Sequence, residues 1–217
     1  MIKIAHFADI HIRNIERHEE YHKIFDKIYT KLNEIKPDRI VIVGDLFESF
    51  IEISNEAKII AGDFLNKLSN ISKVIITRGN HDIRKKNINR TDSIETIIKL
   101  INNPNIEYYN KTGLYKDQNI TWVVYDHPDK ASDPWLNQNK EKNQIYIGLF
   151  HDPIQDSRTD LGKVFTDFPE PILIAFSTLQ RKKYNSLSDE TSSRFKIFSE
   201  PSALKILEVS RNLNCGL

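Results

Sequence analysis

Apolar runs and amphipathic segments alternate along the first half of the chain. Three short apolar runs are typical of strands buried on both faces, and they occupy residues 2–8, 39–44 and 73–77. Apolar side chains recur at helical spacing in the segments that follow these runs, at residues 16–35, 54–68 and 92–101. Ser54 and Asp92 are suited to cap the second and third helices. Strands that alternate with helices predict right-handed crossovers and a parallel or mixed sheet covered on both faces.

The second half of the chain is richer in strands than the first. Short β-favouring segments occur at residues 106–110, 112–115, 120–126, 144–151 and 171–176. We expect these later strands to complete or to face the first sheet. The predicted fold class is therefore α/β, a layered sandwich of mixed β-sheets flanked by helices.

The composition changes after Phe176, where serine becomes dense. Residues 177–217 contain no convincing strand pattern, although residues 201–213 could form a closing helix with Pro201 near its start. We therefore predict one domain over residues 1–176 and an atypical serine-rich tail over residues 177–217.

Overall composition narrows the class of protein without deciding its function. The 217 residues are 39% hydrophobic and 28% charged, as in an ordinary soluble globular protein with one sizeable core. The formal net charge of +1 neither requires nor excludes a nucleic-acid partner. The single cysteine, Cys215, excludes an internal disulfide, and no secretory leader or long apolar run is visible. These features predict a cytoplasmic protein that does not contact a membrane.

Polar side chains follow the predicted strands at the points where they end. The first strand runs into Asp9 and His11, and the second into Asp45. The third ends on the Gly79-Asn80-His81-Asp82 cluster, and a later strand ends on His151. The carboxyl ends of parallel strands form the crevice where open α/β sheets bind ligands, so these side chains should converge in one place.

This set of side chains favours a particular metal chemistry. Carboxylate, imidazole and amide ligands without a thiolate suit Mn²⁺, Fe²⁺ or Zn²⁺. Two such ions held ~3.5–4 Å apart can clamp a phosphate and generate a nucleophile for in-line displacement. A nearby histidine that binds no metal can protonate the leaving alkoxide. Basic residues flank the motifs and could neutralise backbone phosphates, although a solvated loop surface explains them equally well: Arg13, Arg84, Lys85 and Lys86.

Four motifs in order carry a family resemblance: "DIH" at residues 9–11, "GDLF" at 44–47, "GNHD" at 79–82 and "FHDP" at 150–153. They resemble the calcineurin-like metallophosphoesterases, and "AHFADIHIR" and "VGDLFES" are most similar to the SbcD-like nucleases of DNA double-strand-break repair. The resemblance implies two divalent ions, typically Mn²⁺, with Asp9 and His11 binding the first. It implies that Asp45 bridges both ions and that Asn80 and His151 bind the second. It further implies that His81 acts as general acid, that Asp82 orients it, and that Gly44 and Gly79 are needed for their backbone shape.

The resemblance also implies partners and an activity. It points to a DNA exonuclease or endonuclease in repair or recombination, which forms a homodimer and pairs with an SMC-type (SbcC-like) ATPase. Two alternatives stay open: a phosphatase or small-molecule phosphodiesterase of the same superfamily, and a catalytically inactive binding subunit.

One family motif has no counterpart in this chain. The family closes its site with Gly-His-x-His after a later strand, whereas residues 171–176 are followed by Ser177-Thr178-Leu179, and no histidine follows His151. The cap domain of SbcD-like proteins has no counterpart either. Three accounts fit: a truncated or frameshifted product, a degenerate paralogue, or a site completed by water or by acidic residues such as Asp156, Asp160 or Asp167.

Overall fold

The structure is a computed structural model that describes residues 2–84, 87, 90–126, 144–151, 174–176 and 204–209. Its helices are α1 (His18–Ile35), α2 (Asn55–Ile71) and α3 (Ser93–Ile101). Its strands are β1 (Ile2–Ala8), β2 (Arg39–Val43), β3 (Val74–Thr77), β4 (Ile106–Tyr109), β5 (Gly113–Asp117), β6 (Ile120–Tyr125), β7 (Ile145–Phe150), β8 (Ile174–Phe176) and β9 (Leu204–Val209). Among the described helices, none combines the length and the apolar character needed to cross a bilayer.

The first sheet is mixed, with the strand order β4-β3-β2-β1-β9. Its first four strands are parallel, as the alternation of strands and helices predicts. β9 is antiparallel to β1, with pairs running from Ile2 opposite Val209 to Phe7 opposite Leu204. The closing helix predicted at residues 201–213 is therefore wrong for its central part. β1 would otherwise offer an unpaired edge there, and ladder hydrogen bonds along that edge outweigh local helix propensity.

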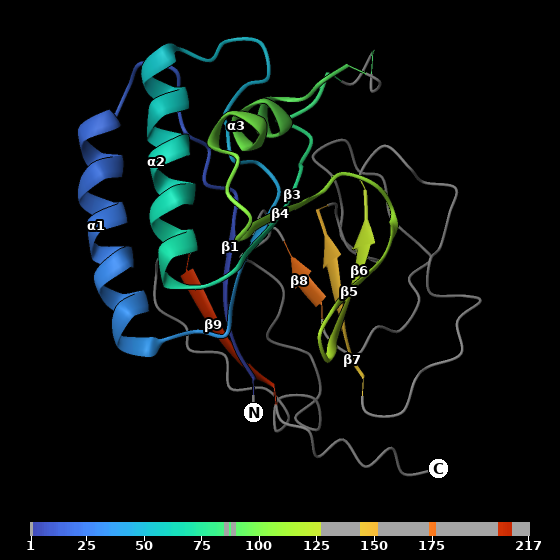
Figure 1. Ribbon diagram of the computed structural model, residues 1–217. Helices are drawn as coiled ribbons and strands as arrows, with labels where there is room; N and C mark the ends of the chain where they lie inside the picture. Colours follow the sequence, from blue (N-terminus) through green and yellow to red (C-terminus); the bar gives the residue numbers. More distant parts are fainter. Residues whose placement is uncertain are drawn as a thin grey trace, which may run out of the picture.

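Alternating side chains of the first sheet point into two separate cores. Phe7, Ile42 and Ile76 belong to the core shared with the three helices. Ile4, Val41 and Ile75 belong to a second core shared with the later strands. Figure 1 shows α1 and α2 on one side of the first sheet and the strands β5–β8 on its other side. The sheet is thus covered on both faces, because the period-two alternation is apolar in both directions.

The second sheet has the strand order β5-β6-β7-β8. β5 is antiparallel to β6, while β6, β7 and β8 run parallel. Trp122 of β6 is fully buried at the centre of the second core. The structure confirms the predicted layered α/β sandwich of mixed sheets, in which β4 extends the first sheet and β5–β8 face it.

Two helix starts follow the predicted caps. The Ser54 hydroxyl accepts a hydrogen bond from the amide of Ala57 at 3.1 Å. The Asp92 carboxylate accepts one from the amide of Glu95 at 2.7 Å. These caps satisfy amides that the first helical turn leaves without partners, and they fix where the chain leaves the site loops.

Candidate metal centre

The carboxyl ends of β1, β2 and β7 bring carboxylates and imidazoles into contact. His151 Nε2 lies 3.0 Å from Asp45 Oδ2, and His11 Nε2 lies 3.7 Å from the same oxygen. His11 Nε2 is also 4.0 Å from Asp9 Oδ1. Asp45 is fully buried at the middle of this group. These four side chains therefore converge at one edge of the sheets, as the strand ends predict.

Two overlapping sets of potential ligand atoms share Asp45. One set comprises Asp9, Asp45 and His151, and the other comprises His11, Asp45 and His81; within each set the atoms lie within 4.8 Å of one another. The sets pair His11 with His81 and Asp9 with His151, a grouping that differs from the one the resemblance implies.

The backbone is strained at three of these residues. Asp9, His11 and Asp45 have φ values of 52°, 51° and 51°, in the left-handed region that disfavours non-glycine residues. Of the other described non-glycine residues with positive φ, Lys36 and Asn102 end helices and Gln118 lies in the β5–β6 turn, where this conformation is ordinary, while Arg17 immediately precedes α1. Strain of this kind persists where the surrounding structure enforces it, and it concentrates at functional sites.

Two glycines allow the strand ends to approach closely. Gly44 has a φ of 71°, and a Cβ there would lie 2.1 Å from His151 Nδ1. A Cβ on Gly79 would lie 2.2 Å from Asp45 Oδ1. Gly79 is therefore needed for space, whereas Gly44 is needed for both space and conformation.

Oxygen atoms lie close to the Nδ1 atoms of three histidines of this group, and Nε2 of His11 and of His151 faces Asp45. His151 Nδ1 lies 3.1 Å from the carbonyl oxygen of Val43, and His81 Nδ1 lies 2.7 Å from that of Glu48. His11 Nδ1 lies 3.3 Å from Glu48 Oε2. A carbonyl oxygen only accepts, so Nδ1 of His81 and His151 carries the proton and Nε2 is the free nitrogen of the neutral ring. Such partners fix the tautomer and orientation of metal-binding histidines.

Asp82 binds backbone amides of the loops that follow β2 and β3, and not the imidazole of His81. Its buried carboxylate accepts hydrogen bonds from the amides of Gly79 at 2.9 Å, Phe47 at 3.1 Å and Leu46 at 3.3 Å. The expectation was that Asp82 orients His81, but the partner found for that ring is the carbonyl of Glu48. Burial, with a further contribution from the charge of Asp45, raises the pKa of Asp82 to about 7.

Asp45 and His151 stabilise each other's charged forms. Burial opposes ionisation of Asp45, but the His151 ring, whose Nε2 lies 3.0 Å from Asp45 Oδ2, outweighs burial and lowers the pKa of Asp45. Burial likewise acts to lower the pKa of His151, and the contact with Asp45 more than offsets it and raises that pKa. Positive charge at this point is therefore strongly favoured.

These residues fit a divalent cation. Asp45 Oδ2 is buried and accepts no hydrogen bond within the described part of the chain, so a ligand-binding oxygen remains available at the shared position. The donors are carboxylates and imidazoles, which suit Mn²⁺, Fe²⁺ or Zn²⁺. A bound ion of this kind polarises a phosphoryl oxygen and lowers the pKa of water.

The remaining predicted residues lie around this centre. Asn80 and Arg84 line a hollow beside His81, and Arg13 lines another beside His11. Lys85, Lys86 and the acids Asp156, Asp160 and Asp167 fall outside the described residues. β8 ends beside β7, with Phe176 opposite Phe150, so the strand predicted to precede the missing motif does reach this edge.

Glu48 is a site residue that the sequence reasoning missed. Its carboxylate contacts His11 and its carbonyl contacts His81, although its side chain is 47% exposed. Its position in the sequence could have indicated this role, because Glu48 directly follows Gly-Asp-Leu-Phe and so lies only three residues after Asp45.

One viral protein and two archaeal proteins are similar to this chain in sequence. Over 170 residues the chain is 36% identical to the uncharacterized protein R555 of Acanthamoeba polyphaga mimivirus, covering 73% of the chain and 13% of that protein. It is 32% identical over 130 residues to the DNA double-strand break repair protein Mre11 of Nanoarchaeum equitans, covering 55% and 36%. It is 23% identical over 223 residues to Mre11 of Methanococcus maripaludis, covering 96% and 59%. The chain thus spans less than two thirds of the length of each of these relatives.

A solved structure, the Pseudomonas putida nuclease MPE, overlaps 67% of this chain and 58% of its own, with 14% identity and a TM-score of 0.36. A likeness this weak adds nothing to the assignment. The model of the calcineurin-like phosphoesterase family, in contrast, matches residues 2–184. That match spans β1–β8, the strained loops and the shared Asp45, and the chain therefore belongs to the calcineurin-like phosphoesterases, a family of metal-dependent hydrolases.

Proposed function

We propose that this chain is a divalent-metal-dependent phosphodiesterase that cleaves DNA, of the SbcD and Mre11 type. The observation that carries the proposal is the buried Asp45 carboxylate shared by two sets of ligand atoms. Adjacent cation sites with a common carboxylate suit in-line displacement at a phosphate, because the attacking and leaving oxygens need stabilisation on opposite sides. Similarity to two archaeal proteins named for DNA double-strand break repair supports DNA as the substrate.

In this proposal the strand ends supply the ligands. By the family resemblance, Asp9 and His11 would hold one ion, Asn80 and His151 would hold the other, and Asp45 would be shared by both, with Mn²⁺ as the metal. The carbonyl of Val43 and the carboxylate of Glu48 hold His151 and His11 with Nε2 toward the ions. Asp82 keeps the second and third strand ends together through three backbone amides.

His81 serves as the general acid toward the leaving alkoxide. Its Nδ1 is held at 2.7 Å by the carbonyl of Glu48, so the Nε2 of the charged ring faces the centre and can deliver its proton there. The amide of His81 donates to Asp45 Oδ1 at 2.9 Å, which ties the acid to the shared carboxylate. A positioned acid of this kind contributes typically ~10²–10⁴-fold.

The wider role proposed is DNA repair or recombination, with a homodimer and an SMC-type ATPase as partners. The repair role is supported by the names of the archaeal relatives, whereas both partners rest on the family resemblance alone. Arg13 lines the hollow beside His11 and Arg84 lines the hollow beside His81, and both would contact backbone phosphates, together with Lys85 and Lys86.

The direct test compares substrates for the Mn²⁺-loaded protein. We expect cleavage of single- or double-stranded DNA and of bis(p-nitrophenyl) phosphate, with little turnover of p-nitrophenyl phosphate. His81→Ala should lower cleavage of DNA by at least ~10²-fold, whereas the control His22→Ala, at an exposed position on α1, should not change it. Faster turnover of the monoester would favour the phosphatase alternative. Binding of DNA without cleavage of any substrate would favour an inactive subunit.

A further inference from the structure

We propose that the hollow between the β1–α1 loop and the first turns of α1 binds the nucleoside on the side of the scissile phosphate that the enzyme retains. This inference rests on the proposed phosphodiesterase function and adds to it a defined place for one arm of the substrate. The hollow has a volume of about 420 Å³. That volume lies within the range of pockets that hold small organic ligands.

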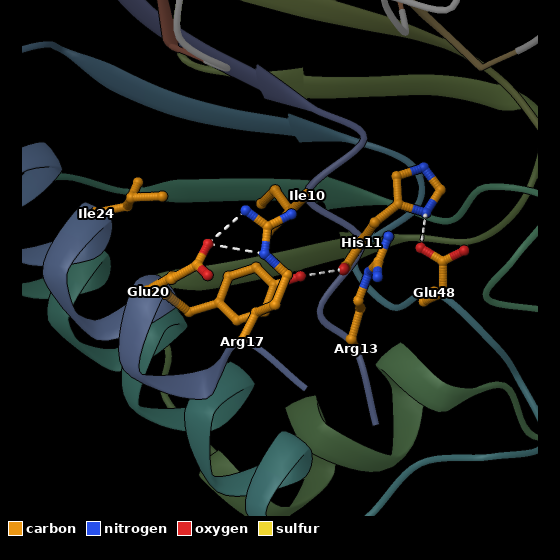
Figure 2. Close-up of a pocket in the computed structure, with 8 residues that line it drawn as sticks. Ile10, His11, Arg13, Arg17, Glu20, Ile24 and Glu48 are labelled. Carbon is orange, nitrogen blue, oxygen red and sulfur yellow. Dashed lines mark hydrogen bonds and ion pairs between the residues drawn. The ribbon is translucent and has the colours of Figure 1, made fainter. Parts of the chain in front are cut away.

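The hollow combines an apolar wall with cationic groups. Ile10, Tyr21 and Ile24 form the apolar side, and Arg13 and Arg17 stand at the rim. Figure 2 shows the Arg17 side chain beside Glu20, with Ile10 behind it and Ile24 further along the helix. A nucleobase offers flat apolar faces and polar edges, and aromatic and guanidinium groups bind such faces by stacking.

The hollow opens onto the metal centre. His11 lines it, and the Tyr21 hydroxyl donates to the carbonyl of His11 at 2.5 Å, so the apolar wall and a proposed ligand are held together. Glu48 lines this hollow and also a second one, of about 310 Å³, whose lining includes Asn80 and His81. Both hollows therefore adjoin Glu48.

Two hollows match the two arms of a phosphodiester. A general acid must reach the leaving oxygen, so the leaving arm lies at the second hollow, where His81 is found. The retained arm then points to the first hollow, beside His11. A phosphomonoester has only one organic arm and would leave the first hollow unused.

The charge of the first hollow selects a nucleoside over a run of phosphates. Arg17 pairs with Glu20, and Arg13 pairs with Glu16 at 3.2 Å. Glu20 and Glu48 also line the hollow. Because Glu20 balances Arg17 and Glu48 adds a further negative charge, this part of the hollow suits a neutral base whose polar edge finds donors and acceptors, while Arg13 would serve the neighbouring backbone phosphate.

The test compares two diesters that differ only in this arm. Thymidine 5′-(p-nitrophenyl) phosphate and its 3′ isomer carry a nucleoside, whereas methyl p-nitrophenyl phosphate has the same charge and leaving group without it. Arg17→Gln and Ile24→Glu should lower kcat/KM about tenfold for at least one thymidine ester and leave the methyl ester within twofold. Calorimetry should show a parallel loss of affinity for the matching thymidine monophosphate.

Matched controls separate this effect from a general loss of structure. Lys31→Gln removes one side of a comparable pair with Glu34 on α1, and Ile59→Glu places a charge at an exposed isoleucine of α2. Neither should alter the ratio of the two esters. Equal losses for thymidine and methyl esters, or no loss for either, would overturn the subsite. If the wild-type protein cleaves no diester, the proposed phosphodiesterase function itself fails.

Discussion

Two buried charged clusters lie at opposite ends of the first sheet, and they differ in how their charges are balanced. At the amino ends, Arg39 binds Asp117 through two nitrogens, at 2.6 and 3.0 Å. Lys73 and the Trp122 indole also donate to this carboxylate, each at 3.2 Å. At the carboxyl ends, Asp9 and Asp45 meet imidazoles, and Asp45 Oδ2 accepts no hydrogen bond within the described residues.

This difference in charge balance suggests a stabilising role for the Asp117 cluster and a ligand-binding role for the Asp45 cluster. The Asp117 cluster supplies its own cations, so it joins the two sheets without any ligand. The Asp45 cluster sits on strained backbone, and its partners are imidazoles, which carry positive charge only when they are protonated. We therefore expect changes at Asp117 to act on stability and changes at Asp45 to act on metal binding.

The largest stability effect should come from Asp117→Asn. This change leaves Arg39 half-buried without its charged partner, and the free energy of unfolding should fall by about 3 kcal/mol. Urea unfolding of the metal-free protein measures it, with Asp63→Asn at an exposed site of α2 as the control. A loss below ~1 kcal/mol would mean that this cluster is not the stabilising one.

Glycine substitutions should break the metal centre by steric overlap. In Gly79→Ala the new methyl group meets Asp45 Oδ1, so Mn²⁺ affinity should fall by at least ~100-fold, beyond the effect of disturbing an outer partner. Gly62→Ala is the matched control, because a Cβ there meets nothing within 4 Å.

In the α2 helix, Gly62→Ala should stabilise the protein by about 0.4–1 kcal/mol. Calorimetric titration gives the affinities, and thermal unfolding gives the stabilities. Unchanged Mn²⁺ binding in Gly79→Ala would contradict the close approach of these strand ends.

Acid should weaken the amino-end cluster over a defined range. Burial opposes ionisation of Asp117, but hydrogen bonds from Arg39 and Trp122 outweigh it and lower the pKa to about 2, from 3.8. A lowered pKa contributes stability above the unfolded value and loses it as the pH falls through the folded one. The stability difference between wild type and Asp117→Asn should therefore shrink by about 2 kcal/mol between pH 5 and pH 2. A difference independent of pH would contradict this account.

The smallest effect should come from Glu48→Gln. The amide keeps an oxygen that can face His11 Nδ1 but removes the charge. The Mn²⁺ affinity should therefore fall by about tenfold at most, the lower limit of the ~10–100-fold loss typical when an outer partner is removed. Glu52→Gln, on the same loop, should leave the affinity unchanged. A loss as large as that of Gly79→Ala would make Glu48 a ligand rather than a positioning residue.

The sequence predicted what depends on local pattern. Apolar periodicity predicted the strands, and residue type predicted the helix caps at Ser54 and Asp92. The parallel topology predicted that four side chains at strand ends converge: Asp9, His11, Asp45 and His151. β9 was missed because its strand form depends on the free edge of β1, a long-range partner.

The sequence also could not predict which backbone atoms contact the side chains of the site. The carbonyls of Val43 and Glu48 orient two histidines, and no residue type marks a carbonyl as an acceptor. The family resemblance implied that Asp82 orients His81, yet its carboxylate accepts hydrogen bonds from the amides of Leu46, Phe47 and Gly79.

The most direct test of the metal centre is the response of stability to Mn²⁺ in wild type and in Asp45→Asn. Ligand binding to the native state raises stability by about 2.7 kcal/mol at a hundredfold excess over Kd. We expect Mn²⁺ to raise the melting temperature of the wild type and of Asp117→Asn, and to leave that of Asp45→Asn unchanged. No response in the wild type, or an equal response in Asp45→Asn, would contradict a metal centre built on Asp45.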